Sequence, residues 1–423
     1  MANEGLAARA AAVALLTAVL DEGQMLVQAQ ADPSVALSGL APGERARAQR
    51  LALTVLRHIE PADRVLKPHL RKEPPMVVRN VLRLALVELA VDHAAAHGVV
   101  NAAVALVRRG HRTQHFAGLV NAVLRKLATT PDLFAGLPPQ RLPFWLRKPL
   151  VDAYGREAVA AMEVVQSRAA PLDISIKPGV EVVLTGAVAL PSGSLRLPGP
   201  VHVSALPGYG AGDWWVQDAA AALAVPLLGV RPGEQVLDLC AAPGGKTLQL
   251  AALGAEVTAL DISEPRLVRL RENLSRTGLA ARVVVADACQ WSGDGPYDAL
   301  VLDAPCSATG TIRRHPDLPF VKDGSELQTL VALQAQLIDR GLGWLRPGGR
   351  MVYCTCSLLL EEGEAQLAAA LDRHPGLRVE PPDVAGIDPA WITGQGGLRL
   401  RPDYWADRGG MDGFFMARLR LAG

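Results

Sequence analysis

The second half of the chain alternates between short apolar runs and longer amphipathic segments, and this alternation restricts the possible folds most strongly. Five apolar runs have the length of β-strands, at residues 235–239, 256–260, 283–286, 299–303 and 350–355. Helical periodicity marks the segments between them, at residues 246–252, 265–277 and 326–345. Strands that alternate with helices pair in parallel, so residues 216–423 are predicted to form an α/β, doubly wound, mostly parallel and Rossmann-like sheet.

The rest of the chain divides into two parts of different character. In residues 1–130, apolar side chains recur at helical spacing, which predicts an all-α bundle with helices at 6–20, 46–56, 77–91, 99–107 and 116–127. Residues 131–215 begin with prolines that indicate a linker, at 131, 138, 139, 143 and 149. A small α+β subdomain is predicted from a short helix at 151–168 and β-runs at 173–177, 180–184, 194–197 and 201–203. We therefore expect three domains, 1–130, 131–215 and 216–423.

Composition argues against several classes of protein. Half of the residues are apolar and 20% are charged, as in soluble globular proteins, and no apolar run is long enough to span a membrane. We also find no pattern of a signal peptide. The five cysteines are odd in number and have neither disulfide nor zinc-site spacing. We therefore expect a cytoplasmic monomer with reduced thiols, no metal ion and no membrane partner.

Charge is distributed unevenly, although the net charge of the chain is only +1. Residues 1–150 carry 19 Lys and Arg against 11 Asp and Glu, a net of +8, whereas the rest of the chain has a net of −7. An excess of basic residues favours contact with a polyanion such as a nucleic acid. A solvated helical surface explains the same excess, and charge alone slightly favours that second interpretation.

A glycine-rich turn joins the first apolar run of the second half to the helix that follows. Glycines there let the backbone approach a ligand closely, and amides at the helix start favour an anionic group. The spacing matches neither the dinucleotide nor the Walker pattern. An acid ends the second run, where it can bind ribose hydroxyls, and another follows the third, where it can accept from an adenine amino group. Capping of turns is the alternative, but the ordered set favours a nucleoside cofactor with a charged tail. The residues expected to bind it are Cys240, Ala241, Ala242, Pro243, Gly244, Gly245, Lys246, Asp261, Asp287 and Asp303.

Two thiols follow the next two apolar runs, at the ligand-binding edge of the predicted sheet. The fourth run ends in Asp-Ala-Pro-Cys306, and the fifth ends in Thr-Cys356-Ser. Most cysteines are small buried hydrophobic residues, and that interpretation suits Cys289 and Cys354. Cys306 and Cys356 lie beyond their strands, so we interpret them as reactive thiols. Spacing alone does not decide which of the two attacks a substrate.

Together these blocks resemble the Nol/Nop/Sun family of RNA cytosine-C5 methyltransferases. The resemblance rests on Asp-Leu-Cys-Ala-Ala-Pro-Gly-Gly-Lys-Thr, Asp-Ala-Pro-Cys-Ser, Thr-Cys-Ser and two further blocks at 310–317 and 412–419, and it covers most of residues 212–420. The bundle, with Leu-Val-Asn-Ala-Val-Leu-Arg-Lys at 119–126, is similar to the NusB-like RNA-binding domain. Such a pairing resembles the bacterial Sun type, which acts on small-subunit (16S) ribosomal RNA. The chain departs from the family at 171–177, where the family is expected to carry Arg and Asn.

The resemblance implies an enzyme that transfers a methyl group from S-adenosylmethionine to carbon 5 of a cytosine in RNA. Carbon 5 becomes sufficiently nucleophilic when a thiolate adds to carbon 6, which is covalent catalysis. By resemblance, Cys356 attacks and Cys306 assists release, while Asp303 is suited to hydrogen-bond the cytosine. A thiolate needs nearby positive charge. The candidates for that charge are Lys246, Arg313 and Arg314. The target base has to leave its stack, which favours an unpaired site in the RNA.

Three other interpretations use parts of the same sequence. An amine methyltransferase of this fold usually carries Asp/Asn-Pro-Pro-aromatic after the fourth strand, and this chain has Asp-Ala-Pro-Cys306 there. The bundle alone suggests a non-catalytic NusB-like RNA-binding or antitermination factor, which leaves the cofactor and thiol blocks unexplained. The same chemistry on transfer RNA agrees with every motif, because substrate choice depends on surfaces that motifs do not describe.

Overall fold

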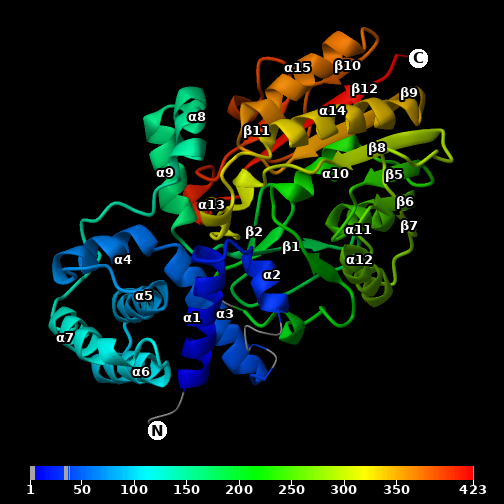
Figure 1. Ribbon diagram of the computed structural model, residues 1–423. Helices are drawn as coiled ribbons and strands as arrows, with labels where there is room; N and C mark the ends of the chain where they lie inside the picture. The colour runs from blue at the N-terminus through cyan, green and yellow to red at the C-terminus, as the bar shows by residue number, and fades with distance from the viewer. Residues whose placement is uncertain (1–4, 33–36, 38, 200, 423) are drawn as a thin grey trace. The chain divides into compact units, whose positions relative to one another are not determined.

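The computed structural model describes residues 5–32, 37, 39–199 and 201–422, which form two compact units (Figure 1). The helical unit comprises Met1–Val151, Gly155–Ala169 and Ile312–Asp323. The sheet unit comprises Asp152–Tyr154, Ala170–Thr311 and Gly324–Gly423. The predicted middle segment 131–215 is thus shared between the two units, and the division into three functional domains remains a proposal. Within the described ranges, no helix combines the length and the apolar character that crossing a membrane requires.

The helical unit is built from α-helices that bury their apolar faces in one core. Its helices are α1 (Leu6–Leu20), α2 (Leu26–Ala31), α3 (Pro42–Leu56), α4 (Ile59–Leu66), α5 (Met76–Ala90), α6 (Ala96–Arg109), α7 (Ala117–Leu127), α8 (Phe144–Tyr154), α9 (Arg156–Gln166) and the short α13 (Leu318–Val321). Fully buried alanines on α1, such as Ala8 and Ala12, let α3 and α5 pack closely against it. The segment of α13 comes from the second half of the chain and is held by the amide of Leu26, which donates to Asp317 Oδ2 over 2.8 Å.

The structure confirms all five helices predicted for the bundle and corrects the segment that follows. The single helix expected at 151–168 is two helices, α8 and α9, because Gly155 adopts φ 83° and ψ 160°, which interrupts the helical hydrogen bonds. Helix α8 also begins within the expected linker. Pro143 is its N-cap and Pro149 lies inside it, so two of the prolines that indicated a linker belong to a helix. Helices α2 and α4 were not predicted.

A small antiparallel sheet opens the sheet unit, with strand order β2-β3-β1-β4. Its strands are β1 (Leu172–Ile176), β2 (Val188–Ala189), β3 (Leu195–Leu197) and β4 (Trp214–Val216). The runs 180–184 and 201–203 were predicted as strands and are not strands in the structure. Leu184 explains the first error, since it packs into the core with Ile174 and Trp214 from a loop, without strand pairing. The buried pair of Asp173 and Arg196, 2.6 Å apart, crosses β1 and β3.

The large sheet confirms the predicted doubly wound architecture and adds an antiparallel edge. Its order is β10-β12-β9-β8-β5-β6-β7, with β11 also paired to β12. The parallel strands are β5 (Gln235–Leu239), β6 (Glu256–Asp261), β7 (Arg282–Val285), β8 (Tyr297–Asp303) and β9 (Leu345–Thr355). The antiparallel strands are β10 (Arg378–Glu380), β11 (Leu398–Leu400) and β12 (Phe414–Arg420). The sheet is therefore mixed, because β12 runs antiparallel to β9, and β10 and β11 each pair antiparallel with β12.

Side chains that alternate along the large sheet fill two separate cores, one on each face. Leu300 and Tyr353 point to the core that contains α14 (Leu327–Gly343) and α15 (Glu364–Arg373), which lie side by side in Figure 1. Val301 and Val352 point to the opposite core, with α10 (Ala224–Leu228). Both faces of β5, β6, β8 and β9 are thus largely buried, so a ligand is expected at the ends of these strands.

The central strand β5 also buries a carboxylate, that of Asp238. Asp238 is fully buried, and its Oδ2 accepts a hydrogen bond of 2.6 Å from the hydroxyl of Thr247 in α11 (Gly245–Ala252). Its Oδ1 has no hydrogen-bond partner among the described residues. Burial raises the pKa of Asp238 to about 7, and the Thr247 hydrogen bond opposes this shift only in part. The strand and the helix are therefore joined through a carboxyl group that titrates near neutral pH.

We predict that Asp238 makes the sheet unit less stable as the pH rises from about 4 to about 7. In that range the folded protein keeps a proton that the unfolded chain, with an ordinary Asp pKa, has released, so each step up in pH favours unfolding. An Asp238→Asn variant keeps an acceptor for Thr247 and should lose this part of the pH dependence. Urea unfolding between pH 5 and pH 8, with the exposed Glu264→Gln as control, measures the difference. If the free energy of unfolding fell equally with pH in the wild type, Asp238→Asn and Glu264→Gln, the prediction would be contradicted.

Candidate active site

The glycine-rich turn after β5 brings the predicted cofactor-binding residues together at the end of the strand. Gly244 has φ 107°, and a Cβ built there would lie 2.3 Å from Leu270 Cδ1, so a larger residue would be strained and would displace the Leu270 side chain. The amide of Ala242 donates to Asp261 Oδ2 over 3.1 Å and fixes the turn to the end of β6. Cys240 also has a positive φ, 60°, which marks the tightness of this turn.

Two further acids lie at the same edge of the sheet. Asp261 is the last residue of β6, is buried, and accepts from the amide of Ser263 over 2.9 Å. Asp287 follows β7 by two residues, is half-buried, and accepts from the amide of Cys289 over 2.9 Å. Because β5, β6 and β7 are adjacent and parallel, their carboxyl ends form one continuous edge. Backbone contacts orient both carboxylates, and each retains acceptor capacity for a ligand.

Asp303 and Lys246 form an ion pair at the end of β8. The Lys246 Nζ donates to Asp303 Oδ2 over 2.7 Å and lies 5.5 Å from the centre of the Phe414 ring. Burial alone would lower the pKa of Lys246, but the charge of Asp303 outweighs it and raises that pKa above its usual value. Lys246 therefore stays a cation. Its hydrogen bond goes to Asp303 rather than to either thiol.

The structure brings the two predicted thiols into direct contact. Cys306 Sγ and Cys356 Sγ are 3.4 Å apart, within hydrogen-bonding distance for sulfur, and both side chains are half-buried. The hydrogen bond to Cys356, together with burial, raises the pKa of Cys306 well above that of a free thiol. Cys306 therefore keeps its proton and can share it with the neighbouring sulfur. Cys354 is buried in the core, in agreement with its interpretation as a small buried hydrophobic residue. Cys289 lies elsewhere, beside Gln336, and is only half-buried, so that interpretation does not fit it.

Sequence reasoning missed a buried glutamate that joins the two thiol-bearing loops. Glu362 has no exposed surface, and its Oε1 accepts from the Ser307 amide over 2.8 Å and from the Gln334 side chain over 3.0 Å. Its Oε2 accepts from the Ser307 hydroxyl. Its backbone carbonyl accepts from Thr355, the residue before the second thiol, over 3.0 Å. The sequence carries no specific signal for Glu362, because Glu361 is the acidic residue that directly follows the apolar run 358–360.

Two of the three basic residues expected near the thiols belong to the helical unit. Arg313 and Arg314 are part of the segment Ile312–Asp323, and the Arg57 side chain donates to the carbonyl of Arg313 over 3.0 Å. Arg313 is fully buried. Their influence on a thiolate therefore remains a prediction.

The chain is similar to known proteins over its whole length. Residues 225–420 match the family of the 16S rRNA methyltransferase RsmB/F, and residues 6–129 match the NusB family. A ribosomal RNA small subunit methyltransferase B from Xanthomonas campestris pv. campestris is 33% identical, with 100% of this chain and 98% of the relative covered. The protein of that name from Vibrio cholerae is 35% identical, with 97% and 96% covered.

Solved structures agree with this likeness. The crystal structure of a methyltransferase homolog protein from Pyrococcus horikoshii is 26% identical, covers 65% of this chain and 93% of its own, and superposes with a TM-score of 0.55. The identity with the two bacterial relatives extends through both the helical bundle and the sheet that carries the paired thiols. The chain therefore belongs to the RsmB/F family of 16S rRNA methyltransferases and carries a NusB-family domain at its N-terminal end.

Proposed function

We propose that this protein transfers a methyl group from S-adenosylmethionine to carbon 5 of a cytosine in small-subunit ribosomal RNA. The observation that carries this proposal is the contact of 3.4 Å between Cys306 and Cys356, next to the acidic end of β8. An amine methyltransferase has no use for two adjacent thiols at this edge. A cytosine-C5 enzyme needs one sulfur to activate the ring and benefits from a second group when the adduct breaks down.

The thiolate of Cys356 adds to carbon 6 of the cytosine, and the electron pair of the C5–C6 double bond becomes available at carbon 5. S-adenosylmethionine, when bound, supplies the methyl group that carbon 5 takes up. A base, such as a water molecule, then removes the proton from carbon 5. The electrons of that C–H bond restore the C5–C6 double bond, and the bond between carbon 6 and sulfur breaks. The thiolate of Cys356 leaves unchanged.

The protonated state of Cys306 suits it to the release step. The S–H group of Cys306 can donate to the sulfur of Cys356, which stabilises negative charge on that sulfur as it leaves carbon 6. This division of roles agrees with the raised pKa of Cys306, since a thiol that keeps its proton is a poor nucleophile. The resemblance to the RNA family, in which the thiol of the Thr-Cys-Ser block attacks, makes Cys356 the better candidate for the covalent bond.

Asp303 is placed to bind the cytosine ring. The ion pair with Lys246 fixes one carboxylate oxygen, Oδ2, and the other lies 3.6 Å from Cys354 Sγ. About a third of the Asp303 side chain remains exposed, so this carboxylate can meet N3 or the amino group of a base that enters from solvent. Charge that develops on the ring during thiolate addition would be stabilised there.

The turn after β5 and the acids after β6 and β7 would hold the cofactor. Residues from Cys240 to Lys246 provide a close backbone approach, and the carboxylates of Asp261 and Asp287 provide acceptors for ribose hydroxyls and an adenine amino group. These groups fit a nucleoside with a charged tail. They position the methyl donor, and the reactive bond belongs to the cofactor itself.

The helical unit would hold RNA through its phosphates. Several of its arginines are already paired with acids, such as Arg9 with Glu88 and Arg83 with Asp63, and so stabilise the bundle. Helices α6 and α7, which pack together, and the connection between them carry exposed basic residues without an ion-pair partner among the described residues. These are Arg108, Arg109, Arg112, Arg125 and Lys126. Such a group positions a nucleic acid without reading its sequence.

Removal of each thiol should have opposite effects on the covalent intermediate. With RNA and S-adenosylmethionine, Cys306→Ala should accumulate an enzyme–RNA adduct that survives denaturing electrophoresis, because the leaving sulfur loses its hydrogen-bond donor. Cys356→Ala should form no adduct, and Cys289→Ala, a control outside the pair, should behave as the wild type. An adduct formed by Cys356→Ala would reverse the two roles.

Glu362 is predicted to be a positioning residue for the reaction. Glu362→Gln leaves one acceptor for the amide and hydroxyl of Ser307, so the loop that carries Cys306 should shift and adduct formation should slow by roughly 100-fold. The KM for RNA should change little, because Glu362 is buried away from the substrate. Glu361→Gln, the exposed neighbour, is the matched control. If Glu362→Gln lowered the thermal stability and raised the KM for RNA together, its role would be merely structural.

A further inference from the structure

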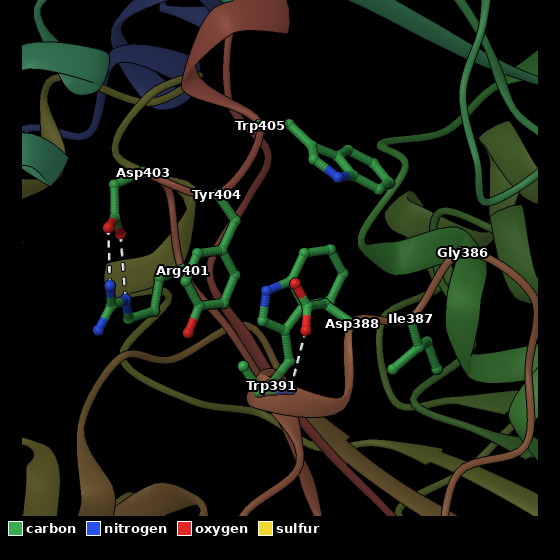
Figure 2. A pocket seen from close by; sticks show the side chains of 9 residues that line it. Gly386, Ile387, Asp388, Trp391, Arg401, Asp403, Tyr404 and Trp405 are labelled. Carbon is green, nitrogen blue, oxygen red and sulfur yellow. Dashed lines mark hydrogen bonds and ion pairs between the residues drawn. The ribbon is translucent and has the colours of Figure 1, made fainter.

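An open cavity of about 760 Å³ in the sheet unit has no part in the proposed chemistry. It lies between the turn η8 (Pro389–Trp391) and the residues that follow β11, and three aromatic rings line it (Figure 2). We call it the aromatic pocket. The residues that matter here are Ile387, Asp388, Trp391, Arg401, Tyr404 and Trp405.

Two of the three rings are stacked on each other, and the third offers a platform. Trp391 and Tyr404 are 5.0 Å apart at an angle of 9°, and the guanidinium of Arg401 lies 4.7 Å from the centre of the Tyr404 ring. Figure 2 shows Tyr404 between these two groups. Trp405 meets Trp391 only edge to face, 5.6 Å away at 65°. No described ring stacks on the faces of Trp405, and its side chain is half-buried.

The polar edges of these rings are unused within the described part of the chain. Neither indole Nε1 of Trp391 and Trp405 nor the hydroxyl of Tyr404 has a hydrogen-bond partner among the described residues. Asp388 uses one oxygen to accept from the Ala390 amide over 2.9 Å and keeps the other for a ligand. The pocket therefore combines stacking surface with both donors and acceptors, which is the chemistry of a nucleobase and not of an aliphatic side chain.

Charge in the pocket disfavours a phosphate group as the occupant. Arg401 is bound to Asp403 over 2.7 Å, so its positive charge is compensated, and Asp388 leaves a net negative charge at the entrance. A flat, uncharged group with hydrogen-bonding edges fits this balance. The bases of unpaired RNA have this character, and aromatic side chains are their usual stacking partners in proteins.

The backbone holds Trp405 in a conformation that bulky residues rarely adopt. Its φ is 54°, in the left-handed region, and its carbonyl accepts from the amides of Arg408 and Gly410 over 2.8 Å each. Strained residues of this kind persist where the surroundings fix them and are concentrated at binding sites.

The pocket is connected to the loop that carries Cys356. Arg399 of β11 donates to the carbonyl of Ser357, the residue after the thiol. Arg401 lies 5.7 Å from the centre of the Tyr154 ring, and the Tyr154 hydroxyl donates to the carbonyl of Leu358 over 2.7 Å. A nucleotide held in the pocket would thus be bound to the same framework as the attacking sulfur.

We propose that the aromatic pocket binds an unpaired base of the RNA substrate, stacked on Trp405, while a different nucleotide is methylated. The identity of the RNA rests on the proposed function. The pocket fixes the register of the strand, so that the correct cytosine reaches the two thiols. It is a binding subsite and takes no part in bond making.

Trp405→Gly is the sharpest test, because glycine accepts the positive φ; since Trp405 also packs against the core, thermal unfolding of the variant checks that the fold is retained. With protein-free small-subunit ribosomal RNA, the KM of this variant should rise about tenfold, the usual loss of one stacked base, while kcat changes less than threefold. Trp405→Phe should recover part of the affinity. Phe144→Ala removes an exposed aromatic side chain outside the pocket and is the control. A KM for Trp405→Gly within twofold of the wild type would overturn the proposal.

Two further measurements separate this proposal from the proposed function. In a short RNA that the wild type methylates, one abasic position near the target should raise the KM of the wild type but not that of Trp405→Gly. If each abasic position raised the KM of Trp405→Gly by the same factor as that of the wild type, no base would be stacked on Trp405. Ultraviolet cross-linking of RNA to the peptide that contains Trp405 needs no methylation. A cross-link without methyl transfer would support the pocket and refute the proposed enzymatic function. Methyl transfer without a cross-link would support the enzymatic function and refute the pocket.

Discussion

The buried carboxylate of Glu362 is the interaction on which the geometry of the thiol site depends. The loops after β8 and β9 each carry one sulfur, and no regular secondary structure pairs them beyond the strand ends. Glu362 accepts from the backbone and side chain of Ser307 in the first loop, while its own carbonyl accepts from Thr355 in the second. A buried carboxylate is costly unless each oxygen is hydrogen-bonded, and here both are. The hydroxyl of Ser357 also contacts those of Ser307 and Thr309 at 3.2 Å each, and these contacts together hold the two sulfurs 3.4 Å apart.

A second constraint acts through the backbone and explains two sequence blocks. The amide of Gly310 donates to the carbonyl of Cys356 over 2.9 Å, and the amide of Gly413 donates to the carbonyl of Gly310 over 2.8 Å. A Cβ on Gly310 would lie 2.0 Å from the carbonyl oxygen of Gly413, so no side chain fits at position 310. The blocks at 310–317 and 412–419 thus begin where three backbone segments meet behind the second thiol.

Sequence alone predicted the parts of this fold that depend on local periodicity. Strands β5, β6, β8 and β9 could be placed because parallel strands that are buried on both faces are continuous apolar runs, and β7 is a short apolar run although it is partly exposed. The strands β10, β11 and β12 were missed because their pairing is antiparallel and long-range, and β10 and β11 are only three residues each. Glu362 could not be identified as a site residue, since its partners Ser307 and Gln334 are 55 and 28 positions away.

Some polar groups of the sheet unit hold its framework together, and others remain available to bind a ligand. Two buried groups that hold the framework are fully paired, Asp173 with Arg196 and Glu362 with Ser307, whereas Asp238 keeps one oxygen without a partner among the described residues. Groups at the ligand edges retain capacity, as do Asp303 and the ring edges of the aromatic pocket. Asp303 and these ring edges are accessible to solvent, so each can exchange hydrogen bonds with water for hydrogen bonds with a ligand. A cytosine at the thiols and a second base at Trp405 would together satisfy these groups, and two contacts along one strand select a site more sharply than either contact alone.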